Sequence, residues 1–155
     1  TPNETEAEVL TGVKVTDEVS CSRAADILLG KGIKTVIITL GGRGSYVATA
    51  TSAQLVPGFK VKAVDTTAAG DTFNGALAVA LAEGMPMLDA VRFANAAGAI
   101  SVTRLGAQPS APKRSEVEKL VSGKKATASR NGGHRLQGPH TNGRARRSTG
   151  AARGR

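Results

Sequence analysis

The 155-residue sequence has no tryptophan, only 3% aromatic residues and a single cysteine. One cysteine cannot form an internal disulfide, which fits a reducing compartment, and we expect Cys21 to be a small side chain near a helix start rather than a reactive thiol. No apolar run approaches the roughly 18–20 residues of a membrane span, and no secretory signal is visible. We therefore expect a cytoplasmic protein with no membrane partner.

Acidic residues are absent from 124–155, and this absence explains the net charge of +9. Residues 1–123 hold 12 Lys and Arg and 12 Asp and Glu, so the basic excess belongs to the tail. The tail has one leucine and no aromatic residue, so we expect it to be disordered. Polyanion binding through it remains an alternative, but without stacking aromatics no specific nucleic-acid partner is expected. His134 and His140 lack Cys or acidic companions, so no metal site is expected there.

The hydrophobic pattern of residues 1–123 predicts one layered α/β domain. The run "TVIITL" at 35–40 is rich in β-branched residues and typical of a strand buried on both faces of a parallel sheet. Ser115 and Glu118 have capping-box spacing for a last helix. The predicted helices lie at 4–10, 17–29, 71–83, 87–101 and 115–121, and shorter antiparallel strands at 45–50 and 53–64.

The segment "DTTAAGDTFNG" at 65–75 places an aspartate where a helix begins. The free N–H groups and the dipole of a helix start attract an anion, and Gly70 lets the backbone approach a phosphate closely. Asp71 is then placed to take a proton from a hydroxyl that attacks the phosphate. An ordinary aspartate helix cap explains Asp71 alone equally well, but not its company.

Two further segments point to the same chemistry. "TLGGRG" at 39–44 is a glycine-rich turn after a buried strand, which suits a nucleotide lying across strand ends. Asn3 and Glu6 place an amide and a carboxylate one turn apart, where they could support a hydrated Mg²⁺ and phosphate oxygens. Each segment alone is weak evidence, since the first could be a plain turn and the second a plain helix start.

Together these segments resemble the ribokinase branch of the PfkB-type sugar kinases, over about residues 1–121. The stretches that carry the resemblance are "TPNETEAEVLTG", "TVIITLGGRGSYV", "VPGFKVKAVDTTAAGDTFNGALAVAL" and "SVTRLGAQPS", in the order and spacing of the family. The resemblance implies a ribokinase-like layered α/β fold. It also implies a cytoplasmic ATP-dependent kinase that uses Mg²⁺ and an activating K⁺, and a homodimer for the full-length family member.

The resemblance also implies roles for individual residues. Asp71 resembles the catalytic base that activates the sugar hydroxyl, and Asn95 aligns with a residue near the adenine. The anion hole for the transferred phosphoryl group corresponds to Ala68, Ala69 and Gly70. The ATP-binding turn corresponds to Thr39, Leu40, Gly41, Gly42, Arg43 and Gly44. Asn3 and Glu6 resemble an Asn-x-x-Glu motif that organises Mg²⁺ and phosphate through water. The surroundings of the K⁺ correspond to Asp65, Thr67, Ser101, Arg104, Gly106 and Ser110.

The resemblance implies D-ribose as the sugar and ribose 5-phosphate as the product, with fructokinase-like and nucleoside-kinase-like specificities as rivals. Ribokinases are about twice as long as the matched region, so we expect residues 1–123 to correspond to a carboxy-terminal half that lacks most sugar-contacting residues. A truncated form with little activity alone is therefore expected. A non-catalytic nucleotide-binding fragment is the alternative from another class.

Overall fold

The computed structural model describes residues 1–130, with side chains described as far as Gly123. Residues 131–155, including His134 and His140, lie outside the described part, and so does most of the segment predicted to be disordered. The helices are α1 (Glu4–Thr11), α2 (Glu18–Gly30), α3 (Ala69–Ala82), α4 (Met87–Ser101) and α5 (Arg114–Arg130), with short 3₁₀ turns η1 (Gly41–Arg43) and η2 (Gln108–Ser110). The strands are β1 (Thr35–Thr39), β2 (Gly44–Thr49) and β3 (Ala53–Pro57).

The three strands form one antiparallel sheet in the order β1-β2-β3. Ile37 of β1 lies opposite Val47 of β2, and Tyr46 lies opposite Leu55 of β3. The predicted parallel ladder for 35–40 is therefore wrong within the described residues, where one parallel bridge joins Thr39 to Asn3. The run is nevertheless buried on both faces, because helices cover both sides of this antiparallel sheet.

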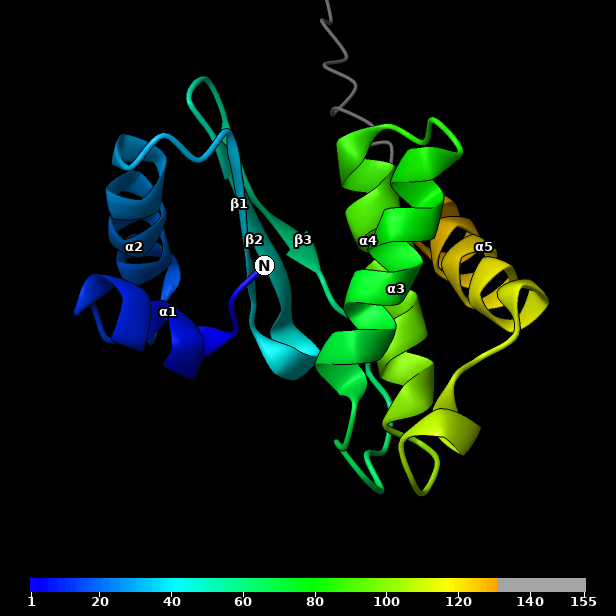
Figure 1. Cartoon of the computed structure of the whole chain (residues 1–155). Helices are drawn as coiled ribbons and strands as arrows, with labels where there is room; N and C mark the ends of the chain where they lie inside the picture. The colour runs from blue at the N-terminus through cyan, green and yellow to red at the C-terminus, as the bar shows by residue number, and fades with distance from the viewer. Residues whose placement is uncertain (131–155) are drawn as a thin grey trace, which may run out of the picture.

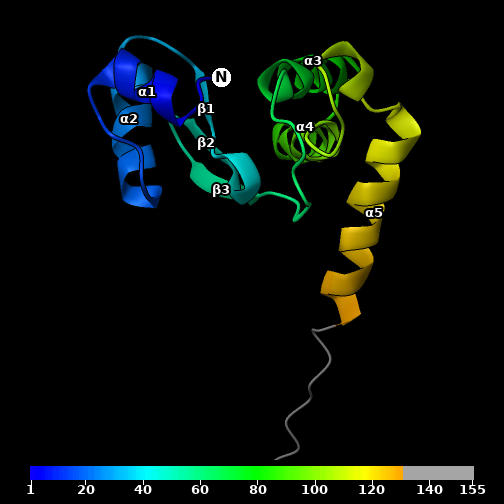
Figure 2. The same ribbon diagram turned by 90° about the horizontal axis from the view of Figure 1, so that it is seen from below.

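Helices α1 and α2 cover one face of the sheet, and α3 and α4 lie on the other (Figures 1 and 2). The side chains of successive residues in each strand point to opposite faces of the sheet. Val36 and Ile38 join the core under α1 and α2, whereas Ile37 joins the core under α3 and α4. Helix α5 packs against α4 at the outside of this second layer. The order is thus helices, sheet, helices, and the expected α/β class is confirmed.

The predicted helices are present, and their ends follow local hydrogen bonding. Asn3 caps α1 by accepting from the Glu6 N–H, and Asp17 caps α2 by accepting from the Ser20 N–H, both with capping-box geometry. The strand expected over 53–64 covers only Ala53–Pro57, and 58–64 is irregular. Pro57 has no N–H to continue a ladder, which limits the strand there. None of the described helices is long and apolar enough to cross a membrane.

Helix α5 differs from its prediction at both ends. It begins at Arg114, and Glu116 rather than Glu118 accepts from the backbone, from the N–H of Lys113 at 2.7 Å. Glu118 instead pairs with Arg114 one turn back, so the expected Ser115–Glu118 capping box is wrong. Helix α5 continues to Arg130, past the predicted start of the tail at 124. The segment "KKATASR" at 124–130 has neither Gly nor Pro and contains several good helix formers.

Candidate functional site

The first turn of α3 begins at an alanine in a left-handed conformation. Ala68 has φ 59°, and it is the single non-glycine residue of positive φ among the described residues. The Ala69 N–H donates to the Thr66 carbonyl at 3.2 Å. Within residues 1–130, the N–H groups of Gly70 and Asp71 make no hydrogen bond. These two free donors, at the positive end of the α3 dipole, form an anion-binding position.

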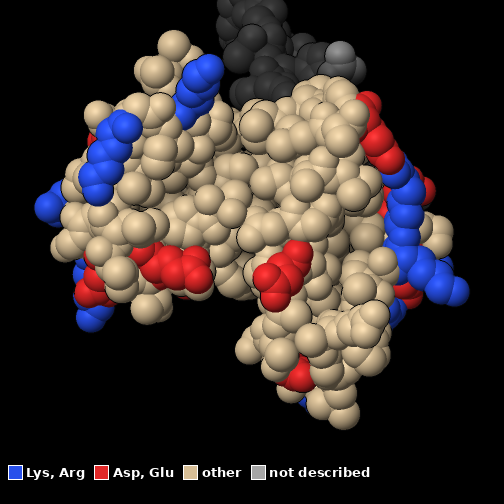
Figure 3. All heavy atoms as spheres, in the orientation of Figure 1, with Lys and Arg blue, Asp and Glu red and all other residues tan. Residues whose placement is uncertain are grey.

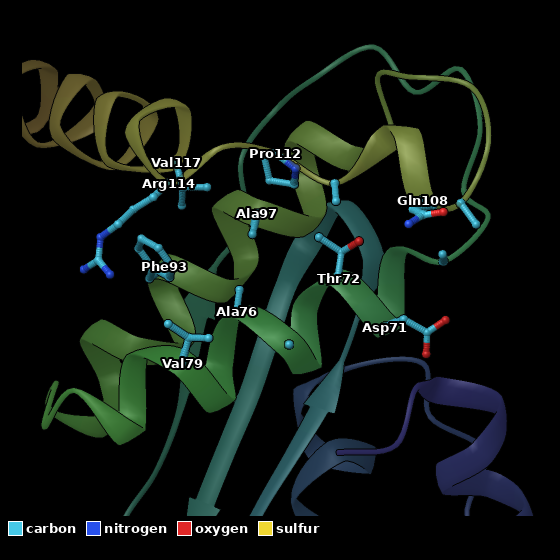
Figure 4. Close-up of a pocket in the computed structure, with 14 residues that line it drawn as sticks. Asp71, Thr72, Ala76, Val79, Phe93, Ala97, Gln108, Pro112, Arg114 and Val117 are labelled. Carbon is cyan, nitrogen blue, oxygen red and sulfur yellow. The ribbon is translucent and has the colours of Figure 1, made fainter.

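Asp71 lies on the outer side of this turn. Its side chain is exposed, and its carboxylate makes no hydrogen bond to another described residue. Figure 4 shows the carboxylate pointing outward at the rim of a cavity of about 580 Å³ between α3, α4 and the start of α5. The cavity is mostly apolar, with Val79, Phe93 and Val117 among its walls. The carboxylate is therefore accessible to a molecule that approaches from outside the protein.

The glycine-rich turn at 39–44 passes very close to the segment that follows β3. The Gly58 N–H donates to the Arg43 carbonyl at 3.1 Å. A Cβ on Gly44, which has φ 108°, would lie 2.1 Å from the Val56 oxygen, and a Cβ on Gly58 would lie 2.5 Å from the Gly42 oxygen. Both positions therefore require glycine. Sequence reasoning found Gly44 but missed Gly58, although a glycine directly after a strand-ending proline is a signal of close backbone approach.

A hollow of about 610 Å³ joins the glycine-rich turn to the first turn of α3. Seven of the site residues predicted from the sequence line this hollow: Thr39, Gly41, Gly42, Gly44, Ala69, Gly70 and Asn95. Wall residues that the sequence did not indicate include Phe59, Lys60, Val61, Ala63, Gly98 and Val102. Asp71 and Ala68 do not line it but lie on the other side of the same helical turn. The hollow thus combines apolar walls, a lysine and helix-start N–H groups.

Asn95 of α4 connects the helix to two strands at the wall of this hollow. Its Oδ1 accepts from the Ser45 hydroxyl at 2.7 Å, and its Nδ2 donates to the Val56 carbonyl at 3.2 Å. Ser45 is fully buried. Asn95 therefore fixes α4 against β2 and β3 at the wall of the hollow. Both its amide oxygen and its amide nitrogen already form hydrogen bonds.

Asn3 and Glu6 are close to the glycine-rich turn because Thr39 donates its N–H to the Pro2 carbonyl at 2.9 Å. The Glu6 Oε2 accepts from the Asn3 N–H, and the Asn3 Oδ1 accepts from the Glu6 N–H, each at 2.9 Å. The Glu6 Oε1 and the Asn3 Nδ2 make no bond to the described residues. Acidic side chains gather over α1, and the one acidic residue of the first turn of α3 lies on the other side of a notch in the surface (Figure 3).

Two segments predicted to surround a monovalent cation, the one that precedes α3 and the loop between α4 and α5, meet near the start of α3. Asp65 joins them, since its Oδ1 accepts from the Thr67 N–H and its Oδ2 from the Gly106 N–H, both at 2.9 Å. Hydrogen bonds from the Thr67 hydroxyl and N–H, and then from Gly106, hold the pKa of Asp65 below its ordinary value. The Val102 carbonyl also accepts from the N–H groups of Val64 and Asp65.

The remaining predicted cation residues have different environments. Ser101 and Ser110 are buried; the Ser101 hydroxyl donates to the Gly98 carbonyl within α4, and the Ser110 hydroxyl donates to the Ala107 carbonyl. Among the described residues, no group of three His, Cys, Asp or Glu side chains could hold a metal. The main-chain carbonyls of Asp65, Thr67 and Gly106 accept no hydrogen bond within residues 1–130. Such a set of neutral oxygens suits a large monovalent cation better than a small divalent one.

Comparisons with known proteins agree with this arrangement. The family described as pfkB family carbohydrate kinase matches residues 1–114. The ribokinase of Haemophilus influenzae is 55% identical over 116 residues, which cover 75% of this chain and 38% of that protein. The ribokinase structure from Thermotoga maritima is 50% identical with a TM-score of 0.72, and the match covers 78% of this chain and 41% of that one.

A ribokinase of Arabidopsis thaliana, solved in complex with ribose and ATP, is 38% identical with a TM-score of 0.73. The match covers 77% of this chain and 39% of that one. In all three comparisons this chain spans only about two fifths of the relative's length.

Proposed function

Because the chain belongs to the pfkB family of carbohydrate kinases, we propose that it forms the phosphate side of an ATP-dependent sugar kinase. The observation that carries the proposal is the hollow of about 610 Å³, where the glycine-rich turn and the first turn of α3 meet. Its apolar walls suit a nucleotide base, and Lys60 and the free N–H of Gly70 suit its phosphates. In this proposal the donor nucleotide lies in the hollow with its last phosphate toward α3.

Asp71 acts as the general base from the other side of the same turn. It takes the proton of the sugar hydroxyl while the hydroxyl oxygen attacks the terminal phosphorus of ATP. The bond from that phosphorus to the bridging oxygen breaks, ADP leaves, and the sugar phosphate forms. The N–H groups of Gly70 and Asp71 stabilise the charge of the phosphoryl group in transit. The exposed carboxylate supports this role, because no other residue within 1–130 forms a hydrogen bond with it.

Two cations belong to the proposal. Mg²⁺ would neutralise phosphate charge, and the free Glu6 Oε1 and the Asn3 amide would hold its water shell. K⁺ would be held by carbonyls of the loops that Asp65 joins, near Thr67, Arg104 and Gly106, with Ser101 and Ser110 shaping the loop. The positive charge of the K⁺ would add to the attraction for the phosphate at the anion site. Neither cation changes the part that Asp71 plays.

We further propose D-ribose as the acceptor sugar and D-ribose 5-phosphate as the product. The support is the identity with ribokinases, one of which was solved with ribose and ATP. A non-catalytic nucleotide-binding role is the second candidate, because the hollow and the anion site lie within this chain, whereas the chain spans only part of its relatives.

The decisive test is a chimera in which this chain's matched residues replace those of the Haemophilus influenzae ribokinase. With ribose, Mg²⁺ and K⁺, we expect ribose-dependent ADP release. Asp71→Asn should lower that rate roughly 10²–10⁴-fold, because it removes the base but keeps the backbone donors. Asp89→Asn is the matched control, since Asp89 also lies exposed in the first turn of a helix.

Unchanged turnover in Asp71→Asn would remove Asp71 from the role of base. Binding of ADP to the 155-residue chain, followed by calorimetry, separates the two candidate functions. Binding by the chain together with an inactive but folded chimera would favour the non-catalytic role. An active chimera that accepts fructose or a nucleoside in preference to ribose would correct the assigned sugar.

A further inference from the structure

The loop between α4 and α5 is held from two sides by carboxylates of different elements. On one side, Asp65 accepts from the Gly106 N–H at 2.9 Å. On the other side, Glu116 of α5 pairs with Arg104 at 2.5 Å between its Oε1 and the Arg104 Nη2. The loop therefore lies between the segment that precedes α3 and the first turn of α5.

Glu116 uses both of its oxygens. The Oε1 accepts from Arg104, and the Oε2 accepts from the Lys113 N–H at 2.7 Å, which fixes the carboxylate against the start of α5. The Arg104 Nη1 also reaches the Ala111 carbonyl at 3.5 Å. The hydrogen bond from Lys113 and then the one from Arg104 lower the pKa of Glu116, so the carboxylate is charged at neutral pH. A doubly bound carboxylate restricts the guanidinium more than a single surface contact would.

The bonds of Asp65 extend this connection to the anion site. The same carboxylate that accepts from Gly106 accepts from Thr67, the residue before Ala68. The order of contacts is Glu116 to Arg104, Arg104 to Gly106 along the chain, Gly106 to Asp65, and Asp65 to Thr67. Ala68 then holds its left-handed conformation and leaves the N–H groups of Gly70 and Asp71 free.

We propose that Glu116 is a positioning residue for the anion site at the start of α3. It acts through Arg104 and the loop, and it touches neither phosphate nor sugar. The inference rests on the proposed function only in taking the first turn of α3 as the phosphate site. Because Glu116 lies at the start of α5, this helix would help to hold the anion site in place in addition to packing against α4.

The test is amide hydrogen exchange by NMR on the 155-residue chain. The Gly106 and Thr67 amides are direct probes, since each donates to Asp65. In Glu116→Gln, we expect both amides to exchange roughly fivefold to tenfold faster than in the wild type, as a charge-assisted bond is lost. The denaturation midpoint should change little, because the side chains of Arg104 and Glu116 are 34% and 39% exposed.

Glu118→Gln is the matched control. It makes the same chemical change on the same helix, but Glu118 pairs with Arg114 and not with the loop. The Gly106 and Thr67 amides should exchange at the wild-type rate in this variant. Arg104→Gln should reproduce the effect of Glu116→Gln, and the double variant should add little to either, because the two residues act as one pair.

Faster exchange confined to residues 113–118 in Glu116→Gln would mean that Glu116 only caps α5, and would overturn the proposal. Equal exchange in the two glutamine variants would overturn it as well. ADP binding to the wild-type chain is measured separately. Failure to bind ADP would count against the proposed nucleotide site, whereas the exchange result decides whether Glu116 positions the turn.

Discussion

Ala68 carries backbone strain at the point where the anion site forms. A left-handed conformation costs an L-residue roughly 1–2 kcal/mol, and Ala68 has no side chain with which to cap α3. The neighbouring bonds of Asp65 and Thr66 hold the turn in place. The left-handed conformation of Ala68 directs the chain into α3, and the N–H groups of Gly70 and Asp71 remain without a hydrogen bond within residues 1–130.

Ala68→Gly and Ala68→Val should therefore differ in their effect on the free energy of unfolding. Glycine relieves the strain but enlarges the entropy of the unfolded chain, so we expect a change of about 0.5 kcal/mol or less. Valine at positive φ should lower the free energy of unfolding by about 1–2 kcal/mol relative to the glycine variant. Urea unfolding of both variants measures the difference. Equal stabilities would show that position 68 is not strained.

Two glycines of this chain should respond in opposite directions to one added methyl group. Gly44→Ala places a Cβ against the Val56 carbonyl, so the turn and β3 must separate, and we expect a loss of about 3 kcal/mol or more. Gly75 lies within α3, and an added Cβ there meets nothing within 4 Å. Gly75→Ala should raise stability by about 0.5–1 kcal/mol. Thermal unfolding of both variants tests the contrast.

At the scale of elements, α4 is the centre of the second layer. It packs against α3 and α5 and contacts two strands of the sheet. Its contact with the sheet includes a polar connection, because Asn95 joins Ser45 of β2 and the Val56 carbonyl of β3. One amide thus keeps α4, β2 and β3 in register at the wall of the hollow.

Asn95→Ala should lower the free energy of unfolding by about 1–3 kcal/mol, since it leaves the fully buried Ser45 hydroxyl without its acceptor. Adding Ser45→Ala should recover part of that loss, because both polar partners are then gone. Denaturant titration of the single and double variants measures the coupling. A double variant that simply adds the two losses would contradict the direct bond.

At the scale of the whole molecule, one thin sheet separates two cores. The first lies between the sheet and α1 and α2, and the second between the sheet and α3, α4 and α5. Polar contacts at the loops connect the parts that form the site. Several of these contacts use the carboxylates of Asp65 and Glu116, so part of the stability of the molecule depends on their ionisation.

Stability should therefore fall in acid. The pKa values of Asp65 and Glu116 are lowered from their ordinary 3.8 and 4.5, because hydrogen bonds favour the charged forms in the folded state. Their contribution is present above the unfolded pKa values and is lost as pH falls through the folded ones. The melting temperature should hold down to pH 4.5 and decline below it. Asp65→Asn should melt lower at neutral pH and show a shallower decline in acid.

The sequence by itself determined the elements and the chemistry that they offer. The periodic apolar positions, the capping residues and "AAGD" at a helix start depend on neighbours along the chain. The helices at 17–29, 71–83 and 87–101 and the strand at 35–40 could therefore be assigned from the sequence. It also indicated the glycine-rich turn of the hollow. Local patterns carry this information because helix and strand periods and end signals are set within a few residues.

Only the tertiary structure decided how these parts meet. The run "TVIITL" indicated a strand buried on both faces, but nothing local in it shows that the strand pairs antiparallel, or that Gly58 passes within contact of Gly42. The separation of Asp71 from the hollow on opposite sides of one helical turn, and the contact of Glu116 with Arg104, were equally invisible. Such contacts join residues distant in the chain, and their energies depend on the packed arrangement of several elements rather than on any one segment.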